Sequence, residues 1–161
     1  MIEYIDIHKA FDVPVLSGVA LKIETRETLS IVGPSGTGKS VLLKTTNGLL
    51  VPDRGDVRID GVSVYNSESG ALARIRRKVG YVFQYAALFD SMNVFENVCT
   101  GLPRAEEKRS RSPEVVRKVC EALEDVNLDP TAVMKKLPSE LSGGMRKRVG
   151  LARAIVGRPE I

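Results

Sequence analysis

The first part of the chain alternates apolar and polar positions. Ile5 and Ile7, and then Val19, Leu21 and Ile23, recur at every second position. This period is typical of half-buried strands in a mostly antiparallel sheet. We therefore expect the chain to begin with antiparallel strands.

Two later segments are short and almost uninterrupted apolar runs. Residues 28–32 read Thr-Leu-Ser-Ile-Val, and residues 79–83 read Val-Gly-Tyr-Val-Phe. The first is typical of a strand buried on both faces of a parallel sheet, and the second predicts a further apolar strand. Between them, Val57 and Ile59 resume the two-residue period before Asp60-Gly61, which is a hairpin signal. The pattern predicts an α/β protein with an N-terminal antiparallel β subdomain.

Helical spacing follows in three places. Residues 39–50 carry an apolar face at 41–43. Residues 103–138 are charged and predict inserted helices, with 104–111 as a mobile connection. Their helically spaced apolar positions are Val115, Val119, Leu123 and Val126. Ser142 is expected to cap a helix over 143–156.

These elements predict how the chain is organised. The expected parts are a β subdomain at 1–27 and 51–64, a strand and helix joined by a glycine-rich turn at 28–50, a helical subdomain at about 90–140, and a helix at 141–156. Ile161 follows a turn and looks like the first residue of another buried strand. We therefore expect the domain to be C-terminally incomplete.

The composition narrows the class of protein without choosing a function. The 161 residues are 43% hydrophobic and 27% charged, which fits one globular domain or a piece of a larger one. The net charge of +4 permits contact with phosphate but does not demand nucleic acid. Two cysteines and one histidine, His8, exclude a disulfide framework and a His-pair metal motif. We see no secretory signal and no apolar run of about 18 residues, so we expect a cytoplasmic protein.

A phosphate-binding loop is the strongest single motif. Its residues are Gly33, Pro34, Ser35, Gly36, Thr37, Gly38, Lys39 and Ser40. The glycines let backbone N–H groups approach a phosphate, Lys39 can reach the β- and γ-phosphates, and Ser40 can place a hydroxyl on Mg²⁺. The loop alone does not distinguish a GTPase, a kinase and an ATPase. A Ras-like GTPase is unexpected, because no Asn-Lys-x-Asp motif occurs.

A second motif lies more than a hundred residues downstream. It consists of Leu141, Ser142, Gly143, Gly144 and Met145. By itself it is only a capped helix start whose amides could bind an anion.

Taken together, the two motifs resemble the ATP-binding subunit of ABC transporters over the whole chain. Residues 141–145 match the family signature, although Met145 replaces the commoner glutamine, and Arg26 stands where the family has a glycine. The resemblance implies a P-loop NTPase fold that binds and hydrolyses ATP with Mg²⁺. Gln84 would contact Mg²⁺ and the attacking water, and Phe11 would lie under the adenine.

The resemblance also implies partners. Two subunits would pair head to tail, with ATP between the phosphate loop of one and the signature of the other. Residues 85–98 would receive a membrane permease, so the subunit would be peripheral on the inner face of the membrane. We expect no nucleic-acid partner, because the long arms or tandem domains of ABC ATPases that act on DNA or ribosomes are not visible.

The detailed sequence favours one subtype. Residues 33–44, residues 83–98 and the Met145 signature look like the ATPase of lipid-trafficking importers, which work with MCE-type substrate-binding proteins. Amino-acid and other importers share much of this pattern and remain an alternative.

One departure concerns catalysis. The family's Walker B strand, with its Mg²⁺-binding aspartate and catalytic glutamate, would begin at about Ile161, and the switch histidine would follow. Without these groups we expect residues 1–161 to bind ATP but to hydrolyse it negligibly. The alternative is a genuine short nucleotide-binding module without turnover.

Overall fold

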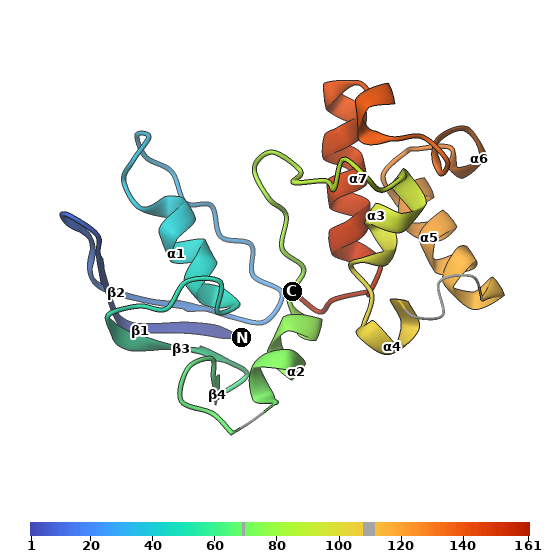
Figure 1. The fold of residues 1–161 in the computed structure, drawn as a ribbon. Helices are drawn as coiled ribbons and strands as arrows, with labels where there is room; N and C mark the ends of the chain where they lie inside the picture. The colour runs from blue at the N-terminus through green and yellow to red at the C-terminus, as the bar shows by residue number, and fades with distance from the viewer. Residues whose placement is uncertain (69, 108–111) are drawn as a thin grey trace. The chain divides into compact units, whose positions relative to one another are not determined.

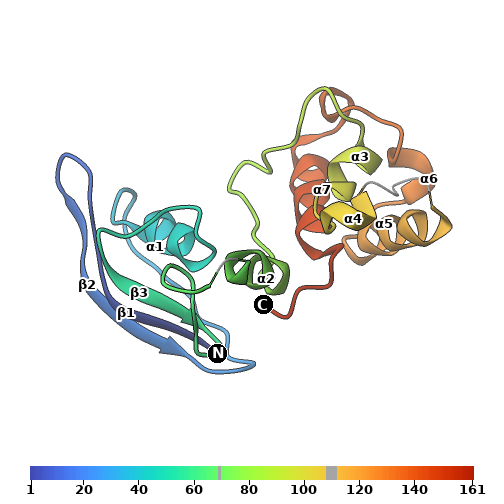
Figure 2. The same cartoon turned by 60° about the horizontal axis from the view of Figure 1, so that its bottom comes forward.

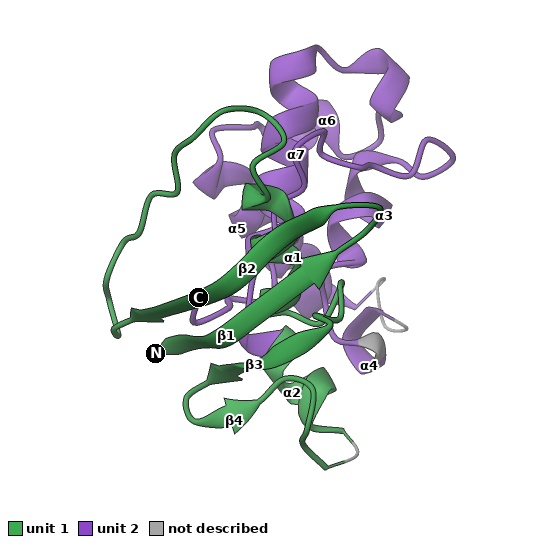
Figure 3. Cartoon of the chain, turned by 90° about the vertical axis from the view of Figure 1, so that its left-hand side faces the viewer, with its two compact units in different colours: residues 1–76 green, residues 77–161 purple. Residues whose placement is uncertain are grey.

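The computed structural model describes residues 1–68, 70–107 and 112–161. The chain divides into two compact units, residues 1–76 and residues 77–161 (Figure 3). The first is built on a sheet and the second on helices. Each unit is described by itself.

The first unit contains a four-stranded antiparallel sheet in the order β2-β1-β3-β4 (Figure 3). Its strands are β1 (Ile2–Ala10), β2 (Pro14–Ile23), β3 (Arg54–Ile59) and β4 (Val62–Ser63). Ile2 at the start of β1 pairs with Ile23 on one side and with Ile59 on the other. The antiparallel start predicted from the alternation is therefore confirmed.

A bulge in β1 changes which side chains face the core. Tyr4 and Ile7 are buried, whereas Ile5 is exposed. Asp6 has a φ of 51°, and both neighbouring strands shift register beside it. One extra residue therefore separates the two buried positions, and the prediction that Ile5 and Ile7 share a face is wrong.

The hairpin between β3 and β4 forms where Asp60-Gly61 predicted it. Both residues have positive φ, 50° and 79°, as the tight turn of a two-residue hairpin requires. Val57 and Ile59 are buried, which confirms the two-residue period in β3.

The two apolar runs do not form strands. Residues 28–32 are irregular, and Val32 is 89% exposed. Residues 79–83 are also irregular, and Val82 and Phe83 are exposed. A strand buried in a parallel sheet needs hydrogen-bonded neighbours, and no strand of the described ranges pairs with either run. The prediction of strands at 28–32 and 79–83 is therefore wrong for this structure.

One fragment of a parallel ladder exists in the second unit. The N–H of Gly80 donates to the carbonyl of Ile161 at 2.7 Å, and the N–H of Ile161 donates to the carbonyl of Lys78 at 3.0 Å. This is the pattern by which a residue pairs with a parallel neighbour, here Val79 with Ile161. Ile161 thus has the backbone pairing of a strand residue, but its side chain is 42% exposed rather than buried as expected.

Two helices accompany the sheet. Helix α1 (Lys39–Thr46) lies on the sheet (Figure 2). The hydroxyls of Tyr4 on β1 and Thr46 on this helix are 2.6 Å apart. The helix stops at Thr46 rather than at residue 50, because Gly48 adopts a left-handed φ of 69°. Helix α2 (Ala71–Lys78) follows the hairpin, and its last two residues belong to the second unit.

The second unit is helical in its regular structure (Figure 1). Its elements are α3 (Val94–Cys99), α4 (Arg104–Glu107), α5 (Pro113–Asp125), α6 (Pro130–Val133), the 3₁₀ turn Pro138–Glu140 and α7 (Gly143–Ile155). One apolar core joins α3, α5 and α7 and includes the four predicted apolar positions, three in α5 and Val126 directly after it. Helices therefore form in the region where the spacing of apolar residues predicted them. Within the connection predicted at 104–111, residues 104–107 form helix α4 instead, and residues 108–111 lie outside the described residues.

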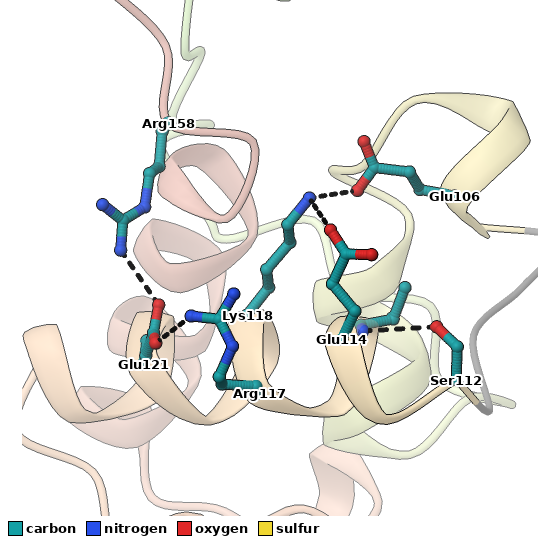
Figure 4. Close-up of polar contacts among 8 residues, drawn as sticks. Glu106, Ser112, Glu114, Arg117, Lys118, Glu121 and Arg158 are labelled. Carbon is teal, nitrogen blue, oxygen red and sulfur yellow. Dashed lines mark hydrogen bonds and ion pairs between the residues drawn. The ribbon is translucent and has the colours of Figure 1, made fainter.

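Ion pairs link the exposed face of α5 to its neighbours (Figure 4). Glu121 accepts from Arg117 on the same helix and from Arg158 beyond α7. Lys118 donates to Glu106 of α4 at 2.6 Å. Pairs at such exposed positions contribute about 0–1 kcal/mol each, so the apolar core holds the unit together.

Candidate nucleotide-binding site

The glycine-rich loop leads directly into α1. Gly38 caps the helix with a left-handed φ of 91°, and Gly36 has a φ of 86°. A Cβ on Gly38 would lie 3.0 Å from the side chains of Val15 and Leu16 and 3.1 Å from the Val15 carbonyl. Glycine is needed at this position both for the backbone conformation and for the close approach of β2.

The Lys39 ammonium lies within the curve of the loop. Its Nζ donates to the carbonyl oxygens of Gly33 at 2.8 Å and Pro34 at 2.5 Å. The Thr37 hydroxyl donates to the same Pro34 carbonyl at 3.0 Å. A positive charge is therefore held beside the start of α1 by the loop's own backbone.

The start of α1 is suited to an anion. Gly38 provides no side-chain cap, and the first turn contains no acidic residue. The leading N–H groups of the helix therefore face no competing carboxylate of that turn, and the helix dipole favours negative charge there. Ser40 is exposed in this first turn and offers a hydroxyl oxygen. Pro34 and Ser35 complete the loop and are exposed.

Phe11 lies in the turn between β1 and β2 and is 60% exposed. The Nζ of Lys9 is 5.7 Å from the centroid of its ring. That ammonium also donates to Asp53 at 2.6 Å, and Asp53 accepts from the N–H of Ala10 at 2.7 Å. The hydrogen bond from Lys9 lowers the pKa of the Asp53 carboxyl. Lys9 and Asp53 thus brace the turn that carries Phe11. Sequence reasoning missed both, because nothing local marks a pair separated by more than forty residues.

The signature residues form a capped helix start in the second unit. Ser142 Oγ accepts from the N–H of Met145 at 3.2 Å, and Leu141 is buried. Gly143 and Gly144 are exposed, and a Cβ on Gly144 would meet nothing within 4 Å. Met145 packs against the helical core. The predicted cap at Ser142 is confirmed, and the two glycines leave the turn open.

Gln84 is exposed at a bend in the second unit. The structure places it with the signature residues in residues 77–161, whereas Phe11 and the phosphate loop lie in residues 1–76. The predicted site residues are therefore divided between the two units.

The segment predicted to receive a permease is partly core. Val94 is buried in the helical core, while Tyr85 is 85% exposed and Phe89 is 52% exposed. The fully buried Asn97 organises the turn, because its amide donates to the carbonyls of Phe89, Met92 and Asn93 and accepts from the N–H of Phe89. The aromatic residues at 85 and 89 are thus presented by a well-bonded turn.

Both cysteines serve packing in this structure. Cys99 is buried in the core, and burial raises the pKa of its thiol to about 11. Burial also raises the pKa of Cys120. Thiols with raised pKa values are poor nucleophiles at neutral pH, so neither cysteine is a candidate catalytic nucleophile.

Most of the chain matches a known protein family. Residues 16–161 match the family model described as ABC transporter. The chain belongs to the ABC transporter family. None of the helices in the described ranges is long and apolar enough to cross a membrane.

Curated relatives in this family differ in the transport function that their names describe. The probable ribonucleotide transport ATP-binding protein mkl of Mycobacterium leprae is 46% identical over 143 residues, covering 89% of this chain and 40% of that protein. The chloroplastic protein TRIGALACTOSYLDIACYLGLYCEROL 3 of Arabidopsis thaliana is 42% identical over 97% of this chain and 44% of its own. The methionine import ATP-binding protein MetN 1 of Pseudomonas fluorescens is 39% identical over 100% of this chain and 48% of its own. The chain spans less than half the length of these relatives.

Solved structures confirm the fold class. A dimeric structure of the ATP-binding cassette MJ0796 bound to ADP and Pi has a TM-score of 0.83 at 29% identity, covering 99% of this chain and 71% of that chain. The protein cbiO1 of Clostridium perfringens, part of the ABC transporter complex cbiONQ, has a TM-score of 0.73 at 27% identity, with coverage of 98% and 62%. The α/β P-loop NTPase fold expected from the sequence is therefore confirmed.

Proposed function

We propose that residues 1–161 form the ATP-binding part of an ATPase subunit that powers an ABC transporter. The phosphate loop carries this proposal, because it combines a helix start that has no side-chain cap with the Lys39 ammonium held beside it. These are the features that bind the phosphates of a nucleotide. Phe11 would stack on the adenine ring, since it is exposed on the same unit as the loop.

The donor set also fits Mg²⁺. The exposed hydroxyl of Ser40 would supply one oxygen ligand, as is usual in phosphate loops. Gln84 would supply its side-chain oxygen to the same ion and orient the attacking water. The bound ion would neutralise charge on the phosphates, while the residues of this chain bind and orient the nucleotide.

The partners proposed are those of a transporter ATPase. A second copy would pair head to tail, so that residues 141–145 of one subunit cover the nucleotide of the other. The cassette MJ0796 is described as dimeric, and cbiO1 as part of a transporter complex, which supports both kinds of assembly. The permease would contact the segment 85–98, where Tyr85 and Phe89 are exposed, and would hold the subunit on the cytoplasmic face of the membrane.

We propose phospholipid or another lipid as the transported class, with an MCE-type binding protein as an indirect partner. One relative is named after the lipid trigalactosyldiacylglycerol, which supports this choice. Relatives named for ribonucleotide transport and methionine import make those substrates the alternatives.

The substrate class can be tested with the full chain and its permease in liposomes. We expect ATP hydrolysis to rise several-fold when the donor vesicles and the binding protein supply phospholipid. Methionine and ribonucleosides at matched concentration serve as controls. Stimulation by either control, with none by phospholipid, would overturn the lipid assignment.

Turnover is proposed to need groups beyond those that residues 1–161 offer. Asp6, Asp53 and Asp60 of the first unit make other contacts: Asp6 bonds to His8 and Arg54, Asp53 to Lys9, and Asp60 to the N-terminal ammonium. Asp6 lies within β1, Asp53 precedes β3, and Asp60 lies in the hairpin turn between β3 and β4.

We therefore expect purified residues 1–161 to bind Mg–ATP with a steady-state rate of phosphate release no higher than that of Lys39→Ala. ATP binding measured by calorimetry on the same preparation controls for correct folding. Phosphate release clearly above the Lys39→Ala rate would show that the segment contains its own catalytic groups.

A further inference from the structure

Two consecutive alanines after Gln84 adopt an unusual backbone conformation. Ala86 has a φ of 61° and Ala87 a φ of 47°, both in the left-handed region. Residues with a Cβ rarely occupy this region, and consecutive occupancy persists only where surrounding contacts impose it. Contacts from elsewhere in the chain must therefore hold residues 86 and 87 in this conformation.

Arg153 of α7 makes the contacts that can hold them. Its Nη1 donates to the carbonyl of Ala87 at 2.7 Å, and its Nη2 donates to the carbonyl of Ala86. Its guanidinium carbon lies 5.9 Å from the centroid of the Phe83 ring. The planar fork of one arginine thus contacts residues on both sides of Gln84.

The packing of α7 supports this arrangement. Ala86 is buried, and a Cβ on Gly150 would lie 3.0 Å from the Ala86 Cβ, so this helix face meets the turn with no space for another methyl group. The backbone of Arg153 also lies very close to Gly101, because a Cβ added to Gly101 would be 1.9 Å from the Arg153 carbonyl oxygen. Arg153 is therefore fixed between the loop after α3 and the turn 83–87.

Helix α7 also carries the signature residues. It runs without interruption from Gly143 to Ile155, with Ser142 as its cap. A helix of this length is stiff, so its two ends move together.

We propose that Arg153 is a positioning residue for Gln84. It holds the turn 83–87 on α7, so that Gln84 and the Ser142 end of the same helix change position together. This inference rests on the proposed function, in which Gln84 contacts Mg²⁺ and water. Arg153 contacts backbone carbonyls of the turn, and its effect on nucleotide chemistry passes through Gln84.

The test uses the full chain with Arg153→Gln, Arg153→Lys and a matched control, Arg148→Gln. Arg148 lies on the same helix and donates to the carbonyl of Asn127 at 2.7 Å, so its loss removes a similar bond at another place. Backbone hydrogen exchange is measured at residues 85–88 and in α5, and the Kd for Mg–ATP and the kcat are measured in parallel.

Arg153→Gln is expected to speed exchange at 85–88 by about tenfold while α5 keeps its protection, because two charge-assisted hydrogen bonds to that turn are lost. Its kcat should fall by about tenfold, with the Kd for ATP within about twofold of wild type. Arg153→Lys should be intermediate, because one ammonium cannot reproduce the fork. Arg148→Gln should leave exchange at 85–88 unchanged.

A rescue separates positioning from simple stability. Glycine adopts the left-handed region without a Cβ penalty, so Ala87→Gly should let the turn persist when Arg153 is replaced. We expect the kcat of the double variant Arg153→Gln/Ala87→Gly to be at least about threefold higher than that of Arg153→Gln alone.

Two results would overturn the inference. One is equal acceleration of exchange at 85–88 and in α5, which would show a general loss of stability. The other is a kcat in Arg153→Gln equal to that of Arg148→Gln. A wild-type chain that fails to bind ATP would instead overturn the proposed function, while the exchange measurement would still report whether Arg153 holds the turn.

Discussion

Replacing Lys39 by alanine is expected to weaken the binding of Mg–ATP by at least about 100-fold. The ammonium lies beside the start of α1, where it bonds to the carbonyls of Gly33 and Pro34. In the nucleotide complex it would exchange these carbonyls for phosphate oxygens. Each hydrogen bond between charged groups is worth about 1.5–3 kcal/mol, and two of them account for the expected loss.

Lys44 provides a matched control for this measurement. It lies in the last turn of the same helix and is exposed. Lys44→Ala removes the same charge from α1 but leaves the loop intact, so its Kd for Mg–ATP should stay within about twofold of wild type. Calorimetry with ATP and with adenosine separates the phosphate contribution from that of the base. Equal Kd values for Lys39→Ala and wild type would rule out the loop as the phosphate site.

Gly101→Ala is expected to destabilise the helical unit by at least about 3 kcal/mol. An added Cβ would lie 1.9 Å from the carbonyl oxygen of Arg153 and 2.9 Å from the side chain of Val156. The first of these atoms belongs to the backbone of α7, so it cannot turn aside as a side chain can. The helix would have to separate from the loop after α3, which would open the core that Val149 and Ala152 share with α3.

The comparison variant is Gly144→Ala. A Cβ at Gly144 would meet nothing within 4 Å, and alanine is favoured over glycine in a helix by up to about 1 kcal/mol. Urea denaturation followed by circular dichroism should therefore show a large loss for Gly101→Ala and no loss for Gly144→Ala. Similar urea midpoints for the two variants would mean that the loop after α3 shifts to accommodate the added methyl group with little loss of stability.

The parts of the fold that follow from neighbouring residues were predictable. Asp60-Gly61 determines a tight turn, Ser142 caps α7, and the spacing of Val115, Val119 and Leu123 determines which face of α5 is buried. Each of these depends on interactions within a few residues, so the pattern contains the information.

The parts that depend on distant neighbours were not predictable. Residues 28–32 have the composition of a strand but no strand partner in the described ranges, and the bulge at Asp6 moves Ile5 out of the core. Apolar composition shows that a segment can be buried, but the hydrogen-bonded neighbour decides whether it is a strand.

The same distinction applies to the candidate site. The phosphate loop and the signature are runs of consecutive residues, so their spacing was visible in the sequence. Lys9 with Asp53, and Arg153 with the turn after Gln84, join residues far apart in the chain through a side chain and a backbone or carboxylate oxygen. An arginine that binds carbonyl oxygens has no recognisable partner in a sequence.

The pairing of Val79 with Ile161 has a consequence for how this family can be re-engineered. Neighbouring strands lie about 4.8 Å apart, so the two ends of the helical unit emerge side by side. A segment with adjacent ends can be exchanged for the corresponding segment of a relative without changing the separation of the two residues at its ends. Chimaeras cut beside these two residues would therefore test whether the proposed permease contact at 85–98 is carried by the helical unit alone.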